Sequence, residues 1–247
     1  MSGHSKWHNI QATKNKADAV RGKIFTKIGR EIAVAVKMGG SDPNNNPSLR
    51  AVIQKAKQNN MPNDNIQRSI KKASGELGSV NYEEITYEGY GVGGSALIVK
   101  CLTDNKNRTA GDVRHAFDKF GGALGSQGCV SYLFDNKGVL VLANDGAIEE
   151  DKLIDMCLEA EAEDVINDED VFQIITSPSN YTKVKDALEG QGLNFISTEV
   201  TMIPQSTIDL DEKQMESFQK LYDALEDLDD VQDVYHNVNL PEVEEED

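Results

Sequence analysis

The chain has few cysteines, no long apolar run and no recognisable targeting segment, and each scarcity excludes a class of protein. Three of its 247 residues are cysteines, at Cys101, Cys129 and Cys157. Their wide spacing and odd number argue against a disulfide framework or a zinc site, and predict reduced, mostly buried thiols in a cytoplasmic protein. The longest apolar runs, such as Val139–Ala143, are far too short to span a membrane. The N-terminal sequence MSGHSKWHNI matches neither a signal peptide nor a transit peptide.

What the chain does have is charge, distributed unevenly along its length. Residues 1–76 hold 14 lysines and arginines and five acids, a net charge of +9, whereas residues 77–247 carry a net charge of −26. A basic segment in an otherwise acidic protein points to a polyanionic partner. Because the acidic part would repel a phosphate backbone, we expect any nucleic acid to be bound by the N-terminal end only. The main alternative is that the basic segment docks on the acidic part of the same chain.

The basic segment predicts three helices packed as a small bundle. In Val20–Met38 apolar residues recur every four positions, and Gly39-Gly40 ends this pattern. Asn46-Pro47 has the form of a helix N-cap followed by proline at the first helical position, and Met61-Pro62-Asn63 begins a third apolar stripe. Helices this short bury their apolar faces only by packing together. We therefore expect a basic helical bundle over residues 1–78.

From residue 79 onward, β-type runs alternate with single helices. The segment from Gly138 to Met202 predicts the order βαββαβ, which is a complete ferredoxin-like unit. The flanking pieces make a second sheet-and-helix unit only if they are joined across the first. The flanking elements that we expect are strands 82–88, 96–103 and 130–134, helix 109–120, a turn at 136–138, helix 211–228 and strand 231–236.

The predicted fold class is therefore α+β, with an N-terminal three-helix bundle and two ferredoxin-like α/β domains, one inserted in the other. The bundle occupies residues 1–78, the middle α/β domain residues 79–136 and 204–247 with an acidic C-terminal tail, and the inserted α/β domain residues 137–203. Since short connections favour neighbours in space, we expect strand 231–236 to pair in one sheet with strands from 82–134, across the inserted domain.

Basic side chains are spaced to form continuous faces on the predicted helices. Four cations lie at 0, +4, +7 and +14, in one lengthwise stripe beside the apolar one: Lys23, Lys27, Arg30 and Lys37. Lysine and arginine contact phosphates whatever the base sequence, and an indole can stack on a base or a ribose. The residues predicted to bind nucleic acid are Lys6, Trp7, Lys14, Lys16, Arg21, Lys23, Lys27, Arg30, Arg68, Lys71 and Lys72. An ordinary solvated helix surface is the alternative for each run.

No motif argues for an enzyme, a metal or a cofactor. His4 and His8 are four residues apart, but no cysteine or carboxylate pair stands at ligand spacing nearby. Gly89–Gly94 lacks both the G-x-x-x-x-G-K-[ST] pattern and the strand-then-helix context of a phosphate-binding loop, so a glycine hairpin is the better interpretation. The sequence has no nucleophile elbow. We expect no catalytic residue, no cofactor, no metal, no membrane partner and no small-molecule substrate.

Short motifs occur along the whole chain, beginning with Gly3-His4-Ser5-Lys6-Trp7 followed by Asn9-Ile10, and later Tyr87-Glu88-Gly89-Tyr90-Gly91. The first looks like the N-terminal signature of the YebC/PmpR family, and the second is similar to the middle domain of that family. Val20 stands where the family usually has lysine, and Val92 where it usually has proline. The further matching motifs are Asp18-Ala19, Arg21-Gly22-Lys23, Phe25-Thr26-Lys27, Arg30-Glu31-Ile32, Asn60-Met61-Pro62, Ile70-Lys71-Lys72, Leu102-Thr103-Asp104-Asn105, Asn107-Arg108-Thr109, Val113-Arg114, Val231-Gln232 and Val234-Tyr235-His236-Asn237.

The resemblance implies a three-domain, cytoplasmic regulator of gene expression without catalytic activity. It leaves two levels of action open. One is a DNA-binding transcriptional regulator, which is the label that many relatives carry. The other is a ribosome-associated translation factor, or translational activator, that binds ribosomal or transfer RNA. The basic residues here are mostly lysines spread over several elements, which suits recognition of phosphates and shape better than base readout and tilts the physical argument modestly toward RNA.

Overall fold

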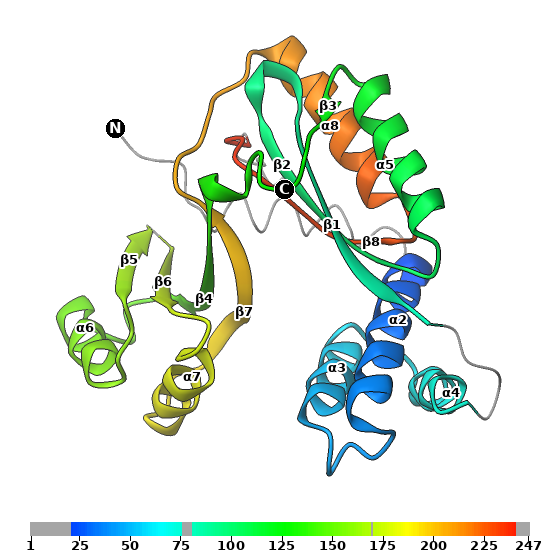
Figure 1. The fold of residues 1–247 in the computed structure, drawn as a ribbon. Coiled ribbons are helices and arrows are strands. Elements are labelled where there is room, and N and C mark those ends of the chain that lie inside the picture. The colour runs from blue at the N-terminus through cyan, green and yellow to red at the C-terminus, as the bar shows by residue number, and fades with distance from the viewer. Residues whose placement is uncertain (1–20, 76–80, 169, 241–247) are drawn as a thin grey trace. The chain divides into compact units, whose positions relative to one another are not determined.

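The structure of the chain, a computed structural model, describes residues 21–75, 81–168 and 170–240 (Figure 1). The described residues form two compact units. The first unit comprises the residues up to Ser131 together with Ile208–Asn239, and the second comprises Tyr132–Thr207. Each unit contains its own four-stranded antiparallel sheet. None of the helices in these described ranges is long and apolar enough to cross a membrane.

Within residues 21–75, the first unit contains three helices, α2 (Arg21–Gly39), α3 (Pro47–Gln58) and α4 (Asn63–Ala73). Their apolar faces share one core, as the spacing of the apolar residues predicts. The buried members of this core are Ile28, Ile32, Ala35, Val36, Leu49, Ala56, Met61, Ile66 and Ile70. The three expected helices are therefore confirmed.

Asn46 joins the end of α2 to the start of α3. Its Oδ1 accepts a hydrogen bond from the Leu49 N–H at 3.0 Å, which is the N-cap contact expected for α3. Its Nδ2 donates to the carbonyl oxygens of Ala35 and Gly40, at 2.7 and 2.8 Å, and so satisfies acceptors at the end of α2. Because the Asn46 side chain is also buried, this one polar residue ties the two helix ends together.

The sheet of the first unit contains β1 (Glu83–Tyr90), β2 (Ala96–Thr103), β3 (Ala123–Leu124) and β8 (Val231–His236), in the spatial order β3-β1-β2-β8. Helices α5 (Lys106–Lys119) and α8 (Glu212–Glu226) lie side by side along this sheet (Figure 1). A short glycine-containing connection joins β1 to β2, where Tyr90 lies opposite Ala96. The glycine hairpin expected from the sequence is confirmed.

β8 pairs with β2 although the whole second unit lies between them in the sequence. Tyr235 lies opposite Ile98, so the expected pairing of strand 231–236 with the strands of 82–134 is confirmed. The chain order of this unit is ββαβαβ, however, and not βαββαβ, so the ferredoxin-like prediction is wrong for the first unit. After α5 the chain returns to the sheet as only two paired residues, Ala123 and Leu124, beside β1, and then leaves it.

The second unit follows the predicted chain order. Its elements are β4 (Phe134–Ala143), α6 (Glu150–Glu159), β5 (Asp164–Asp168), β6 (Val171–Thr176), α7 (Tyr181–Gly190) and β7 (Phe195–Pro204). The strands lie in the spatial order β5-β6-β4-β7. Leu140 and Leu142 of β4 belong to the core shared with α6 and α7, whereas Val139 and Val141 alternate with them and belong to a second cluster. The central strand is apolar on both faces, so it reads as a continuous apolar run.

One boundary of the second unit differs from the prediction. The sequence predicts a strand over 130–134 and a turn at 136–138, but β4 runs without a break through this turn. Asn136 and Lys137 lie opposite Met202 and Thr201 in the ladder with β7. Pairing with a neighbouring strand therefore overrides the local turn signal.

Gly138 in this segment is required by packing rather than by a turn. A Cβ atom at this position would lie 2.6 Å from Thr176 Cγ2 and 2.8 Å from Tyr181 Cδ2. Glycine in a strand often marks such a close approach. The glycine of the Asn-Lys-Gly sequence is therefore explained by a tight contact within the second unit.

Candidate nucleic-acid interface

Three cations lie together on the exposed face of α4. Arg68, Lys71 and Lys72 are exposed, whereas Ile66 and Ile70 on the opposite face are buried in the bundle core. Within the part of the chain that the structure describes, none of the three cations forms an ion pair. Lys71 and Lys72 stand in the last turn of α4, where the partial negative charge of the helix end favours a cation. This face is open to a polyanion.

The basic stripe of α2, in contrast, meets carboxylates of the same unit. The three ion pairs join Lys23 Nζ to Asp227 Oδ1 at 2.6 Å, Lys27 Nζ to Glu226 Oε2 at 2.8 Å, and Arg30 Nη1 to Asp230 Oδ1 at 2.5 Å. These acids lie at the end of α8 and in the turn before β8. These three cations therefore dock on the acidic part of the chain. This is the alternative that the charge distribution raised.

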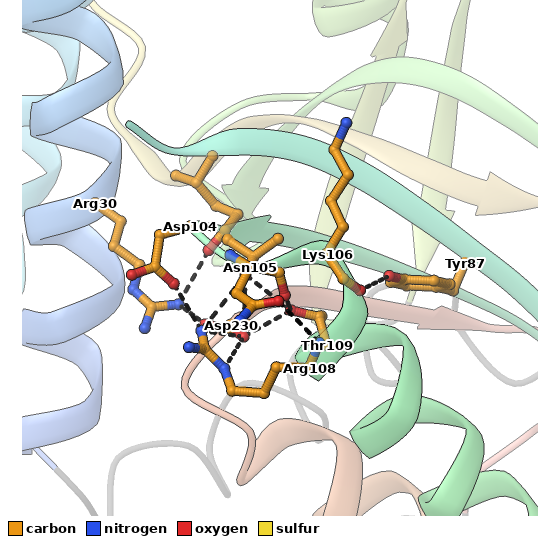
Figure 2. Close-up of polar contacts among 10 residues, drawn as sticks. Arg30, Tyr87, Asp104, Asn105, Lys106, Arg108, Thr109 and Asp230 are labelled. Atoms are coloured by element: carbon orange, nitrogen blue, oxygen red, sulfur yellow. Dashed lines mark hydrogen bonds and ion pairs between the residues drawn. The ribbon is translucent and has the colours of Figure 1, made fainter. Parts of the chain in front are cut away.

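Asp230 is the centre of a buried polar network that joins α2 to α5 (Figure 2). Arg30 of α2 donates to its Oδ1. Arg108 of α5 donates to both carboxylate oxygens, from Nη2 at 2.9 and 2.8 Å, and from Nε to Oδ2 at 3.2 Å. The hydroxyl oxygens of Thr109 and Thr103 lie 2.7 and 3.1 Å from Oδ2. One carboxylate thus holds two guanidinium groups from different helices.

Backbone groups extend this network into the sheet. The Leu102 N–H of β2 donates to the Asp230 carbonyl oxygen at 2.8 Å. The Leu102 carbonyl oxygen in turn accepts a hydrogen bond from Arg30 Nη1 at 3.0 Å. The turn before β8 is therefore held to β2 by its backbone and to α2 through Arg30.

The start of α5 positions Arg108 for its role. Asn105 caps the helix, since its Oδ1 accepts the Arg108 N–H at 3.1 Å, and its own N–H donates to Thr103 Oγ1 at 2.9 Å. Asp104 Oδ1 lies 2.8 Å from Arg108 Nη2 and steadies the guanidinium from the other side. Figure 2 also shows Tyr87, whose hydroxyl group donates to the Lys106 carbonyl oxygen at 3.4 Å.

The electrostatics of the network favour charged groups throughout. Burial acts to raise the pKa of Asp230, but hydrogen bonds from Thr109, Arg108 and Arg30 outweigh it and hold the pKa below the ordinary value of 3.8. Hydrogen bonds to Asp230 and then to Asp104 raise the pKa of Arg108. At neutral pH the network is therefore a carboxylate between two cations.

The side chain of Glu88 is a second buried carboxylate in the first unit. Its Oε1 accepts the Gly128 N–H at 2.8 Å, and its Oε2 accepts the N–H groups of Val130 and Ser131 at 2.9 and 2.8 Å. Burial acts to raise the pKa of Glu88, but the hydrogen bonds from Val130, Gly128 and Ser131 hold the pKa below its ordinary value. The carboxylate therefore fixes the loop that leads out of the first unit.

We expect Glu88→Gln to loosen this loop and to lower the free energy of unfolding by about 2 kcal/mol, because a neutral amide keeps one acceptor oxygen for three N–H donors. Hydrogen exchange at the amides of Gly128, Val130 and Ser131 measures the effect and should become faster. Glu84→Gln, at an exposed position of the same strand, is the matched control. Unchanged exchange at the three amides would contradict this account of the loop.

Four of the predicted nucleic-acid-binding residues lie outside the described part of the chain: Lys6, Trp7, Lys14 and Lys16. Arg21 opens α2, and nothing is described of its side chain. Arg50 and Lys57 of α3 are further exposed cations of the bundle that the prediction left out. Asp230 was also missed, because one acid among many carries no local signal, and Arg108 stood in a family-like motif without being assigned a role.

The three cysteines are free, as the sequence predicts. Burial raises the pKa of Cys101 to about 12 and the pKa of Cys157 to about 11. Both thiols are therefore protonated near neutral pH and are poor nucleophiles. In the described ranges no three His, Cys, Asp or Glu side chains are grouped so that they could hold a metal ion.

Two family models match most of the chain. The model described as "TACO1/YebC protein N-terminal domain" matches residues 5–76. The model described as "TACO1/YebC second and third domain" matches residues 82–238. The matched ranges include α2 to α4 and both sheets.

Bacterial proteins are similar to this chain over all or nearly all of its length. A "Probable transcriptional regulatory protein" of Clostridium botulinum (strain Okra / Type B1) is 58% identical over 242 residues, which are 98% of each chain. A protein with the same description from Ruminiclostridium cellulolyticum is 58% identical over 247 residues, which are 100% of each chain. Among solved structures, the crystal structure of the conserved hypothetical protein Aq1575 from Aquifex aeolicus matches with a TM-score of 0.77 and 45% identity, over 93% of this chain and 95% of that one.

Proposed function

Because this chain belongs to the TACO1/YebC family, we propose that it is a non-enzymatic, nucleic-acid-binding regulator of gene expression that acts on DNA as a transcriptional regulator. The description shared by relatives that are 58% identical over the full length supports the transcriptional level of action. The proposal includes a cytoplasmic location, and it requires neither a cofactor nor a small-molecule substrate.

The observation that carries the proposal is the exposed cationic face of α4. The whole chain has a net charge of −17, so a cluster of exposed cations that have no carboxylate partner is a positive surface on an acidic protein. Arg68, Lys71 and Lys72 occupy such a face within a single short helix. Clustered cations of this kind attract a polyanion and contact its phosphates.

We propose that the interface consists of this face together with the N-terminal lead. The lead contributes the predicted residues Lys6, Trp7, Lys14, Lys16 and Arg21. Lys23, Lys27 and Arg30 are placed differently, because each already has a carboxylate partner. They join the interface only where a phosphate displaces that partner.

A second candidate is a ribosome-associated translation factor that binds ribosomal or transfer RNA. Phosphate contacts from Arg68, Lys71 and Lys72 are available to either nucleic acid, so the charge of α4 supports both candidates. The spread of lysines over several elements suits shape recognition of structured RNA. The description of the relatives favours DNA.

Crosslinking in cells, followed by sequencing of the bound DNA and the bound RNA, tests the choice. The control is the full chain with Arg68, Lys71 and Lys72 changed to glutamine. A transcriptional regulator enriches particular DNA sites over the control, and its RNA recovery equals that of the control. Enrichment of ribosomal or transfer RNA, with no enriched DNA site, would replace the DNA proposal with the translation factor.

We also propose a finer architecture. The second unit is a ferredoxin-like domain, since both its βαββαβ chain order and its β5-β6-β4-β7 strand order fit that fold. The three domains are those expected from the sequence, 1–78 for the helical bundle, 79–136 with 204–247 for the middle domain and 137–203 for the inserted domain, except that β4 already begins at Phe134, so the inserted domain begins before residue 137. The pairing of β8 with β2 supports the insertion.

A further inference from the structure

The helical bundle has an apolar core of its own, and its junction with the end of α8 is polar. Every apolar residue of the bundle core and those packed against it lies between Ile24 and Ala73. Across the junction, three cations of α2 meet three carboxylates. Arg30 also lies over the Tyr82 ring, with 5.5 Å from its Cζ to the ring centroid. Ion pairs near the surface weaken as salt or a competing ion is added, whereas an apolar core does not.

The three ion pairs differ in how much water reaches them. The side chains of Lys23 and Asp227 are 34% and 71% exposed, and those of Lys27 and Glu226 are 16% and 21% exposed. The inner pair is the most buried, since Arg30 is 12% exposed and Asp230 7%. Exposed pairs such as that of Lys23 and Asp227 contribute little to stability, and the half-buried pair of Lys27 and Glu226 is intermediate. The outer two pairs can therefore exchange partners more readily than the inner pair, which holds the junction.

The carboxylates at the outer pairs resemble a nucleic-acid backbone in the charge they present. Glu226 and Asp227 are adjacent in the sequence, and their oxygens accept hydrogen bonds from ammonium groups as phosphate oxygens do. They thus offer two negative charges to Lys23 and Lys27. The two lysines are one helical turn apart on α2, beside the apolar stripe that faces the bundle core.

We propose that Glu226 and Asp227 are an internal competitor for nucleic acid, which occupies Lys23 and Lys27 in the free protein and is displaced by phosphates in the complex. The inference rests on the proposed function and adds a second binding surface to the α4 face. Arg30 and Asp230 stay paired in both states. The competition lowers the affinity of the protein for any short polyanion. Only partners long enough to contact both the α4 face and the two lysines of α2 bind with high affinity.

The test compares Glu226→Gln/Asp227→Asn with the control Glu216→Gln/Asp229→Asn in the full chain. Both variants remove two negative charges from the α8 region, but Glu216 pairs with Lys220 and Asp229 is exposed, so the control leaves Lys23 and Lys27 paired. The probes are a fluorescent 20-base-pair duplex of mixed sequence and inorganic polyphosphate. The test variant should bind each about fivefold to thirtyfold more tightly than the control. Its log K against log salt should also be steeper by about 1.4 to 1.8.

A second measurement compares how fast the lysine side chains react when no polyanion is present. Acetylation of the full chain followed by mass spectrometry should show Lys23 and Lys27 reacting more slowly than Lys71 and Lys72, and faster in the test variant than in the control. Unfolding temperatures should remain alike, because the inner pair is intact. The single variant Asp227→Asn, at the most exposed acid of the junction, is the reserve if the double variant unfolds.

The outcomes separate this inference from the proposed function. In one outcome the test variant and the control bind the duplex with equal affinity, while changing Arg68, Lys71 and Lys72 abolishes that binding. This result would overturn the competition and leave the proposed function standing. Tighter polyphosphate binding and faster acetylation, with no duplex bound by any form, would support the competition for phosphates and overturn the proposed action on DNA. Equal acetylation of Lys23 and Lys71 in the unchanged chain would overturn the competition outright.

Discussion

Replacing Asp230 by asparagine should lower the free energy of unfolding by about 3 kcal/mol, because it removes one partner of a buried ion pair. The Arg30 guanidinium would remain almost buried without a counter-charge, and the Thr109 hydroxyl group would lose a charged acceptor. Urea unfolding at neutral pH measures the loss. Asp229→Asn, at the exposed neighbouring position, is the control and should change the free energy by less than about 0.5 kcal/mol.

The pH dependence of this difference has a definite sign. A carboxyl group whose pKa is lower in the folded protein than in the unfolded chain stabilises the fold above the unfolded value. That contribution is lost as the pH falls through the folded value. The pKa of Asp230 is held below 3.8, so the gap between the unchanged chain and Asp230→Asn should be full at pH 7 and should shrink below pH 3.8. A gap that grows on acidification would contradict an ionised Asp230 at the centre of the network.

Changing Arg68, Lys71 and Lys72 together to glutamine should weaken nucleic-acid binding roughly a hundredfold at about 0.15 M salt. This estimate assumes one duplex phosphate contact for each cation. The loss of three such contacts should also make the slope of log K against log salt shallower by about 3. The fold should persist, because these side chains lie opposite the buried Ile66 and Ile70. Anisotropy titrations across a range of salt concentrations measure both quantities.

The matched control for the α4 variant removes the same number of cations from the acidic part of the chain. Lys152, Lys183 and Lys220 are exposed, and changing them to glutamine should leave the salt slope unchanged. A control that weakens binding as much as the α4 variant would mean that net charge, and not the α4 face, governs binding. Full affinity in the α4 variant, with its circular dichroism unchanged, would show that the interface lies elsewhere.

Local sequence patterns predicted those parts of the fold that depend on neighbours along the chain. The apolar spacing in 20–38 and the Asn46-Pro47 cap both act within one or two helical turns, and α2 and α3 form as expected. The βαββαβ order of the second unit was also visible, since its strands and helices are long enough to show their periods. The pairing of β8 with β2 followed from the incompleteness of the flanking pieces.

The errors arose where distant contacts decided the outcome. Asn136, Lys137 and Gly138 form a turn signal when taken alone, but pairing with β7 keeps them extended. β3 has only two residues, too few to give a pattern, and with it the ββαβαβ order of the first unit remained hidden. Strand ladders join residues that a sequence window never compares.

The sequence predicted that the candidate site is positively charged, but not which of its cations are free to bind a partner. The spacing of Lys23, Lys27 and Arg30 correctly placed them on one stripe of α2. It could not tell which anion they meet, because their partners lie about 200 residues further along the chain. For Arg68, Lys71 and Lys72 the same reasoning predicted the exposed face that the structure has.

Mapping the residues that touch bound nucleic acid tests the central claim most directly. Photo-crosslinking of the duplex to the full chain, followed by mass spectrometry of the crosslinked peptides, gives their positions. The account predicts crosslinks within residues 1–75, including the α4 peptide that carries Arg68, Lys71 and Lys72, and none within 132–207. Crosslinks concentrated in 132–207, or an α4 peptide that never crosslinks while the duplex is bound, would contradict it.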